Sequence, residues 1–96
     1  MASSKDYLDY VLDVLREVDD IHYQKMMGEY LLYSGKTLFG GIYDNRFLVK
    51  KTLSSSALGL KEAIPYPGAK AMLLMDSEDA DAVKKIVEGI VGDLQK

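Results

Sequence analysis

The first twenty residues carry the hydrophobic pattern of an amphipathic helix. Ser3 and Asp6 have the serine-to-acid spacing of a capping box, which predicts that a helix begins there. Apolar residues then recur at steps of three and four, at Leu8, Val11, Leu12, Leu15 and Val18. Because such steps place the side chains on one face, we expect a helix of about four turns that ends near residues 19–20.

Residues 21–51 change to strand-forming residue types that are interrupted by turn residues. Breaks at residues 34–36 and 44–45 have hairpin spacing, so the pattern predicts an antiparallel meander of three strands at residues 23–33, 37–43 and 46–51. Gly40 and Gly41 fall inside the second of these strands. Glycine weakens a strand, so we expect a β-bulge, a strong twist or the close approach of a helix there.

The remaining chain predicts a short helix, a strand and a long helix. Residues 54–56 are serines that can cap a helix through about residue 63, before Pro65. Tyr66, Pro67 and Gly68 predict a type II turn with Pro67 and Gly68 at its centre. The apolar run at residues 69–75 predicts a strand that is buried on both faces or lies at an interface. Residues 76–79 can cap a final helix, whose apolar stripe is Val83, Ile86, Val87, Ile90 and Leu94.

This order of elements predicts an α+β fold with a largely antiparallel sheet, in the order helix, three strands, helix, strand, helix. With 96 residues the chain has the length of a single domain, which we assign to residues 1–96. The run of five apolar residues at 71–75 is more than one small domain can cover. We therefore expect a homodimer that uses the strand or helix surface of residues 69–94.

Charge is distributed unevenly along the chain. Residues 1–20 sum to −4, residues 21–75 to +4 and residues 76–96 to −3, for a net charge of −3. Nucleic-acid-binding domains usually carry a dominant basic face, so nucleic acid is an unlikely partner, although contact through the basic middle segment stays an alternative. The absence of cysteine fits a reducing cytoplasm, and no apolar run has the length of a membrane span, so we expect a cytoplasmic protein with no membrane partner.

The residues offer no catalytic apparatus. His22 is the only histidine and there is no cysteine, so a conventional zinc site would need three carboxylates around it. No Gly-x-Ser-x-Gly motif accompanies the serines, and the glycines match no phosphate-binding motif. The carboxylates of the first helix form the row of a solvated face. We therefore predict a non-enzymatic protein without catalytic residues, metal ligands or a cofactor.

The segment KMMGEYLLYSGKTLFGGIYDNRFLVKK resembles the N-terminal domain of the TfoX/Sxy family of bacterial competence regulators. The resemblance covers nearly the whole chain, with Met27 in place of the family's usual phenylalanine and Glu29 in place of its second glycine. The later segment YPGAKAMLLMD also matches the family's layout. The family-motif positions, with a structural or interaction role, are Lys25, Met26, Gly28, Tyr33, Gly35, Gly40, Gly41, Lys50, Tyr66, Pro67 and Gly68.

This resemblance implies a stand-alone TfoX N-terminal-like domain with a secretion-chaperone-like fold, in which a curved antiparallel sheet carries helices on one side and commonly dimerises. It implies a regulatory or adaptor domain that acts by protein–protein contact, linked to the transcriptional regulation of competence, with an unknown protein partner. The alternative is a small-molecule-binding domain, which a deep apolar cleft lined by tyrosine and methionine would favour, or a domain that contacts nucleic acid.

Overall fold

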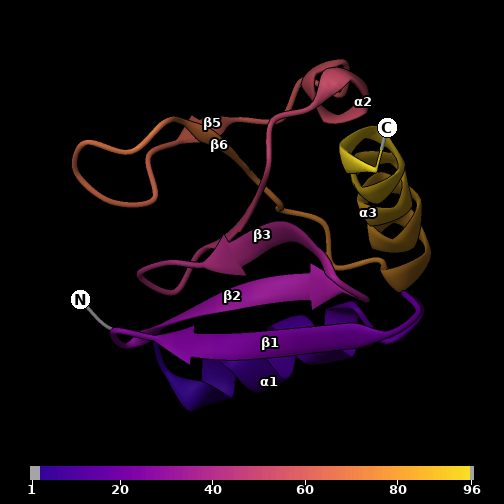
Figure 1. Ribbon diagram of the computed structural model, residues 1–96. Helices are drawn as coiled ribbons and strands as arrows, with labels where there is room; N and C mark the ends of the chain where they lie inside the picture. Colours follow the sequence, from indigo (N-terminus) through magenta and orange to yellow (C-terminus); the bar gives the residue numbers. More distant parts are fainter. Residues whose placement is uncertain (1–2, 96) are drawn as a thin grey trace.

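The structure, a computed structural model, describes residues 3–95. Three helices and a six-stranded antiparallel sheet form an α+β fold, and the strand order in the open sheet is β1-β2-β3-β4-β6-β5 (Figure 1). The elements are α1 (Lys5–Val14), β1 (Ile21–Met26), β2 (Glu29–Ser34), β3 (Thr37–Ile42), β4 (Phe47–Val49), α2 (Leu53–Ser56), β5 (Glu62–Ala63), β6 (Met72–Leu74) and α3 (Ala80–Leu94). The predicted α+β class and antiparallel sheet are confirmed.

Helix α1 begins as expected but is shorter than its apolar stripe predicted. The N-cap is Ser4 and not Ser3 as the capping-box spacing predicted: the Ser4 hydroxyl accepts a hydrogen bond from the amide of Tyr7, while the Ser3 hydroxyl donates to Glu29. The helix ends at Val14, and tight turns continue to Val18, whose side chain is still buried. In a longer helix the carboxylates of Asp19 and Asp20 would lie at the negative end of the helix dipole. This repulsion opposes extension of the helix to residue 20. The backbone then reverses at Asp20, with φ of 57°.

The predicted first strand, residues 23–33, is wrong in one respect: it is two strands joined by a tight hairpin. Met27 and Gly28 form the turn with φ of 52° and 83°, and Met26 pairs with Glu29. Two successive residues with positive φ make a type I′ turn, whose twist suits a two-residue hairpin. Methionine is an unusual residue for that conformation, so the sequence did not reveal the turn. Four strands therefore precede α2 instead of three.

The two glycines of β3 lie beside a β-bulge, as predicted. Leu32 pairs with Gly40 while Tyr33 pairs with Leu38, so Phe39 is the extra residue of the bulge and has no pairing partner on β2. A Cβ on Gly40 would lie 2.4 Å from the carbonyl oxygen of Leu48. The close approach therefore comes from the backbone of β4 and not from a helix.

The segment after β4 differs from its prediction in length. Helix α2 spans only Leu53–Ser56, because Gly59 takes φ of 72° and the chain then enters the unpredicted strand β5. The strand predicted over residues 69–75 is confined to Met72–Leu74, and it is hydrogen-bonded on both edges, to β4 and β5. The turn before it is confirmed: the amide of Ala69 donates to the carbonyl of Tyr66 across Pro67 and Gly68, with φ of 87° at Gly68.

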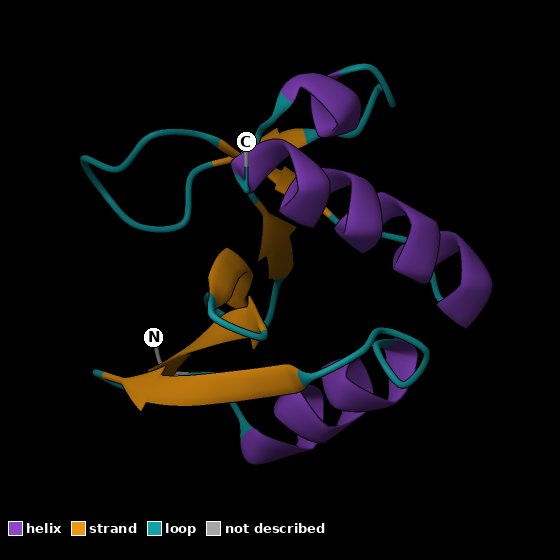
Figure 2. Cartoon of the chain, turned by 45° about the vertical axis from the view of Figure 1, so that its right-hand side comes forward, coloured by secondary structure: helices purple, strands orange, loops and turns teal. Residues whose placement is uncertain are grey.

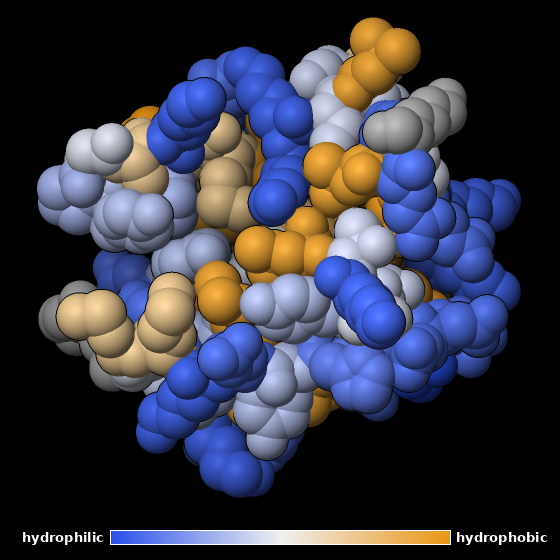
Figure 3. Space-filling model, in the orientation of Figure 1, coloured by the Kyte–Doolittle hydropathy of each residue, from blue (hydrophilic) through white to orange (hydrophobic). Residues whose placement is uncertain are grey.

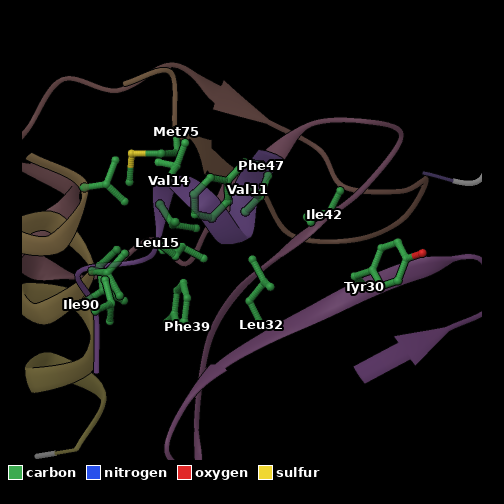
Figure 4. Packing of buried hydrophobic residues seen from close by; sticks show 14 of the residues in the cluster. Val11, Val14, Leu15, Tyr30, Leu32, Phe39, Ile42, Phe47, Met75 and Ile90 are labelled. Atoms are coloured by element: carbon green, nitrogen blue, oxygen red, sulfur yellow. The ribbon is translucent and has the colours of Figure 1, made fainter. Parts of the chain in front are cut away.

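The hydrophobic core lies on one face of the sheet, against α1 and α3. Val11, Val14 and Leu15 converge on Phe39, Phe47 and Met75 (Figure 4). Helix α1 runs along β1 and β2, while α2 lies beside α3, where the amide of Ser54 donates to the Asp93 carboxylate (Figure 2). The predicted stripe of α3 is only partly buried, since Val83, Val87 and Ile90 are in the core and Leu94 is exposed. Within residues 3–95, none of the helices has the length and apolar character required to cross a lipid bilayer.

Candidate functional site

The face of the sheet opposite α1 and α3, called the outer face below, also carries apolar residues. Leu31, Gly41 and Leu48 are directly paired neighbours on β2, β3 and β4. The side chains of Leu31 and Leu48 therefore point to the same face of the sheet. The neighbouring row, from Tyr30 through Ile42 to Phe47, lies in the core, so Leu31 and Leu48 point the other way. Leu48 is nevertheless completely buried. The outer face is therefore covered at its centre and does not simply face solvent.

A groove crosses this outer face beneath the loop of residues 64–71. Two adjoining hollows of about 660 Å³ and about 390 Å³ share Leu38, Tyr43, Pro65 and Tyr66 in their walls. We call them together the outer groove. Apolar residues gather between this loop and the β1–β2 turn, with hydrophilic residues around them (Figure 3). The larger hollow has a mostly apolar wall that includes Met26, Met27, Leu31, Leu38, Tyr43 and Tyr66.

One arginine holds the loop of residues 64–71 against the β3–β4 hairpin. The Arg46 guanidinium donates to the carbonyl oxygen of Tyr43 at 3.2 Å and to that of Ile64 at 3.0 Å. The rings of Tyr43 and Tyr66 then pack at a centroid distance of 6.1 Å and an angle of 50°. Arginine has several donors in a fixed fork, so a single side chain can fix two carbonyls at once. This junction keeps one wall of the outer groove in place.

The hairpin itself is fixed by Glu29 from the other side. The Glu29 carboxylate accepts hydrogen bonds from the amide and hydroxyl of Ser3 and from the amide of Asp44. Ser3 in turn accepts from the amide of Asn45, and residues 44 and 45 form a two-residue turn with φ of 53° and 54°. Hydrogen bonds to a charged acceptor are stronger than neutral ones. Glu29 thus links three distant segments at the end of the groove.

Met27 stands at the rim of the groove in an unfavourable conformation. Its side chain is 97% exposed, although methionine is apolar, and its backbone is left-handed. Asparagine and glycine are the usual residues at such a turn position. A fully exposed apolar side chain at a position that disfavours it adds apolar surface to the groove without any benefit to the core.

The two ends of the groove differ in charge. Lys50, Lys51 and Lys70 line the smaller hollow, and within residues 3–95 only Lys51 of the three has an ion-pair partner, Glu62. Glu29 is the one acidic residue of the wall, and its oxygens are already engaged. Burial raises the pKa of the Tyr43 hydroxyl above its ordinary value, with smaller contributions from Tyr66, Glu29 and Tyr33. The groove is therefore apolar near β1 and β2 and basic near β6.

The structure gathers some of the family-motif positions at the groove and separates others. Met26, Gly40, Lys50 and Tyr66 line it, and Pro67 and Gly68 form the turn in the overlying loop. Gly28 lies in the β1–β2 turn, and the ring of Tyr43 occupies the space directly above Gly41.

Three motif positions lie elsewhere. Lys25 pairs with the core residue Tyr30 and so lies on the face of α1, Tyr33 reaches Gln24 on β1, and Gly35 binds the carbonyl of Asp20 at the far turn. Sequence reasoning missed Met27, Leu31, Leu38 and Lys70 as groove residues. The alternation of β2 and β3 could have placed Leu31 and Leu38 on one face, but nothing local indicates the loop above them.

The single histidine of the chain lies outside the groove. His22 lies 2.7 Å from the carboxylate of Asp20, and both side chains are exposed on the surface beyond the groove. Among the residues that the structure describes, no three histidine or acidic side chains lie close enough together to hold a metal ion. What the groove offers is apolar contact area, two tyrosine rings and lysine charge, which suit binding.

Comparison with known proteins gives one relative. No family model matches the chain. The uncharacterized 12.7 kDa protein in the trpE 5′ region of the bacterium Spirochaeta aurantia is 33% identical over 78 residues, which cover 79% of this chain and 68% of that protein. The chain therefore belongs to the same family as this uncharacterized spirochaete protein.

Proposed function

We propose that this protein is a non-enzymatic binding domain that acts by contact with another protein, and that the contact is made in the outer groove. The observation that carries the proposal is the groove itself: an apolar hollow of about 660 Å³ on the outer face, continued by a basic hollow of about 390 Å³. Apolar patches that are rimmed by polar residues mark interaction sites on small domains.

The residue types of the groove support a protein partner. Tyrosine and methionine are enriched at the centres of protein interfaces, and methionine adapts to partners of different shape. Here Tyr43 and Tyr66 form the middle of the wall, while Met26 and Met27 extend it toward β1. Met26 is 49% exposed, so both methionines are accessible to a partner.

The TfoX/Sxy resemblance supports the finer parts of the proposal. On that basis the domain is a TfoX N-terminal-like, secretion-chaperone-like fold, cytoplasmic and homodimeric, with a regulatory role linked to the transcription of competence genes. The position of Met26, Gly40, Lys50 and Tyr66 around one groove supports a shared role for these motif positions in interaction.

A small molecule is the second candidate occupant. The volume of the larger hollow lies in the range of ligand pockets, roughly 300 to 1,000 Å³. Its wall contains the tyrosine and methionine side chains that such a site would use. The site lies on the outer face of the sheet, opposite α1 and α3.

Photo-crosslinking in cells tests the proposal and separates the two occupants. A photoreactive amino acid is placed at Met27 or Tyr66 in the groove, and at Lys36 in the β2–β3 turn as the control. We expect protein adducts of defined mass from both groove positions, which unlabelled domain competes away, and none from Lys36. Adducts only with a small molecule would favour the alternative. If the groove positions give nothing that the control lacks, the proposal is wrong.

A further inference from the structure

We infer that the outer groove takes an extended peptide segment in which a large apolar residue is followed by acidic residues. This inference rests on the proposed function and specifies the chemistry of the partner. It follows from three features of the groove: its direction across the sheet, the change from apolar to basic wall along it, and the exposed methionine at its apolar end.

The direction of the groove sets the length of the segment. The apolar hollow is lined by Met26 on β1 and Leu31 on β2, and the basic hollow reaches Met72 on β6. Four strand spacings separate β1 from β6 in the sheet order, or about 19 Å at roughly 4.8 Å each. An extended chain of about six residues spans that distance at roughly 3.3 Å per residue.

The charges set the order of residues within the segment. Lys50 and Lys70 line the β6 end and have no ion-pair partner among residues 3–95, so carboxylates of a partner can form ion pairs with them. The opposite end presents Met26, Met27, Leu31 and Leu38, which suit a leucine or an aromatic side chain. An apolar residue near β1 and acidic residues near β6 therefore match both ends at once.

A peptide suits the groove better than a nucleic acid does. Single-stranded nucleic acids need exposed aromatic faces for stacking and a continuous basic track. Here the Tyr43 and Tyr66 rings already contact each other, and the apolar half of the groove has no lysine or arginine in its wall. The chain as a whole also carries a charge of −3.

Fluorescence titration of the full chain with labelled synthetic peptides tests the inference. The probes are LFLGDEDE, the charge-reversed LFLGKRKR, and SSSGDEDE, which lacks the apolar half; labelled oligo-dT is the nucleic-acid probe. We expect LFLGDEDE to bind at least about tenfold more tightly than either other peptide, with an affinity that falls as salt is added.

Matched variants assign the binding to the groove. The double variant Lys50→Glu/Lys70→Glu should weaken binding of LFLGDEDE about tenfold. The control Lys36→Glu/Lys85→Glu makes the same change in net charge on exposed residues outside the groove and should leave the binding unchanged. Met27→Asn places a preferred residue in the β1–β2 turn, so this variant should retain the fold and still bind LFLGDEDE more weakly.

Several outcomes would overturn the inference. Equal binding of LFLGKRKR would remove the acidic requirement, and equal binding of SSSGDEDE would remove the apolar one. Equal losses in the two double variants would place the contact outside the groove, and tighter binding of oligo-dT would assign the groove to nucleic acid. If groove positions form protein adducts in cells but LFLGDEDE has no advantage, only this inference fails; if neither occurs, the proposed function fails with it.

Discussion

The ring of Tyr43 lies directly over Gly41, so closely that a Cβ at residue 41 would come within 2.7 Å of the ring atom Cε2. The same Cβ would lie 2.7 Å from the carbonyl oxygen of Tyr30. The ring of Tyr43 also contacts that of Tyr66. The absence of a side chain at residue 41 is thus what allows one wall of the outer groove to form.

Replacement of Gly41 by valine should lower the free energy of unfolding by about 1 to 3 kcal/mol, because the added atoms overlap backbone and ring. Urea denaturation measures the loss. Gly92→Ala is the matched control, since its Cβ would meet nothing within 4 Å in helix α3, and it should instead gain up to about 1 kcal/mol. Equal stability of the valine variant and the parent would contradict the account of residue 41.

Replacement of Glu29 by alanine should cost about 1 to 3 kcal/mol, because its carboxylate satisfies donors of Ser3 and Asp44. Amide exchange should rise at Asp44, which loses its acceptor, and less at Ser3, whose amide also donates to the carbonyl of Gly28. Glu62→Ala, which removes an exposed ion pair with Lys51, is the control and should change stability by less than about 1 kcal/mol. If both variants lose the same amount, Glu29 has no special role at the groove end.

The raised pKa of Tyr43, caused mainly by burial, predicts a dependence of stability on alkaline pH. The folded protein holds this proton more tightly than the unfolded chain, whose tyrosines titrate near their ordinary value of about 10. The stabilisation is therefore fully present below about pH 10 and is lost as pH rises through the pKa of the folded state. Burial also raises the pKa of Tyr10, so phenolate absorbance during titration should show a late component that shrinks by about one tyrosine in Tyr43→Phe. A late component of undiminished size in that variant would contradict the account of Tyr43.

The homodimer predicted to use residues 69–94 can be tested on the surface of α3. Strand β6 is paired on both edges, so within residues 69–94 the helix surface is what a second copy can use. Leu94 at the end of α3 is exposed. We expect light scattering to give twice the 10.7 kDa of one chain and Leu94→Lys to halve that mass. Tyr10→Lys, an exposed position on α1, should not change it, and a parent mass of one chain would refute the dimer.

The parts of the fold that could be predicted are those that local chemistry decides. Ser4 and Asp79 cap their helices through hydrogen bonds to nearby amides, and Pro67–Gly68 fix their own turn, so the neighbouring sequence suffices. The β1–β2 turn was missed because Met27 occupies a conformation that methionine rarely adopts. Strand β5 was missed because its two residues form a strand only by pairing with β6.

The groove could not be predicted for a different reason. Its walls come from the β1–β2 hairpin, from β3 and from the loop of residues 64–71, and these segments meet only through tertiary contacts such as Arg46 with Ile64. The family resemblance selected Met26, Lys50 and Tyr66 without indicating that they surround one cavity. Its other positions, such as Gly35, serve turns that lie far from the groove.

The carboxylate of Glu29 also bears on the order in which the chain folds. Its bonds to Ser3 close a loop of 26 residues, and the bond from Asn45 to Ser3 closes one of 42. Such closures lose more chain entropy than the hairpins on either side, which pair neighbouring segments. The hairpins of β1 to β4 can therefore assemble first. The N-terminal segment and β6, which pairs with β4 across a similar separation, join them later, so the groove reaches its final shape after its hairpins have formed.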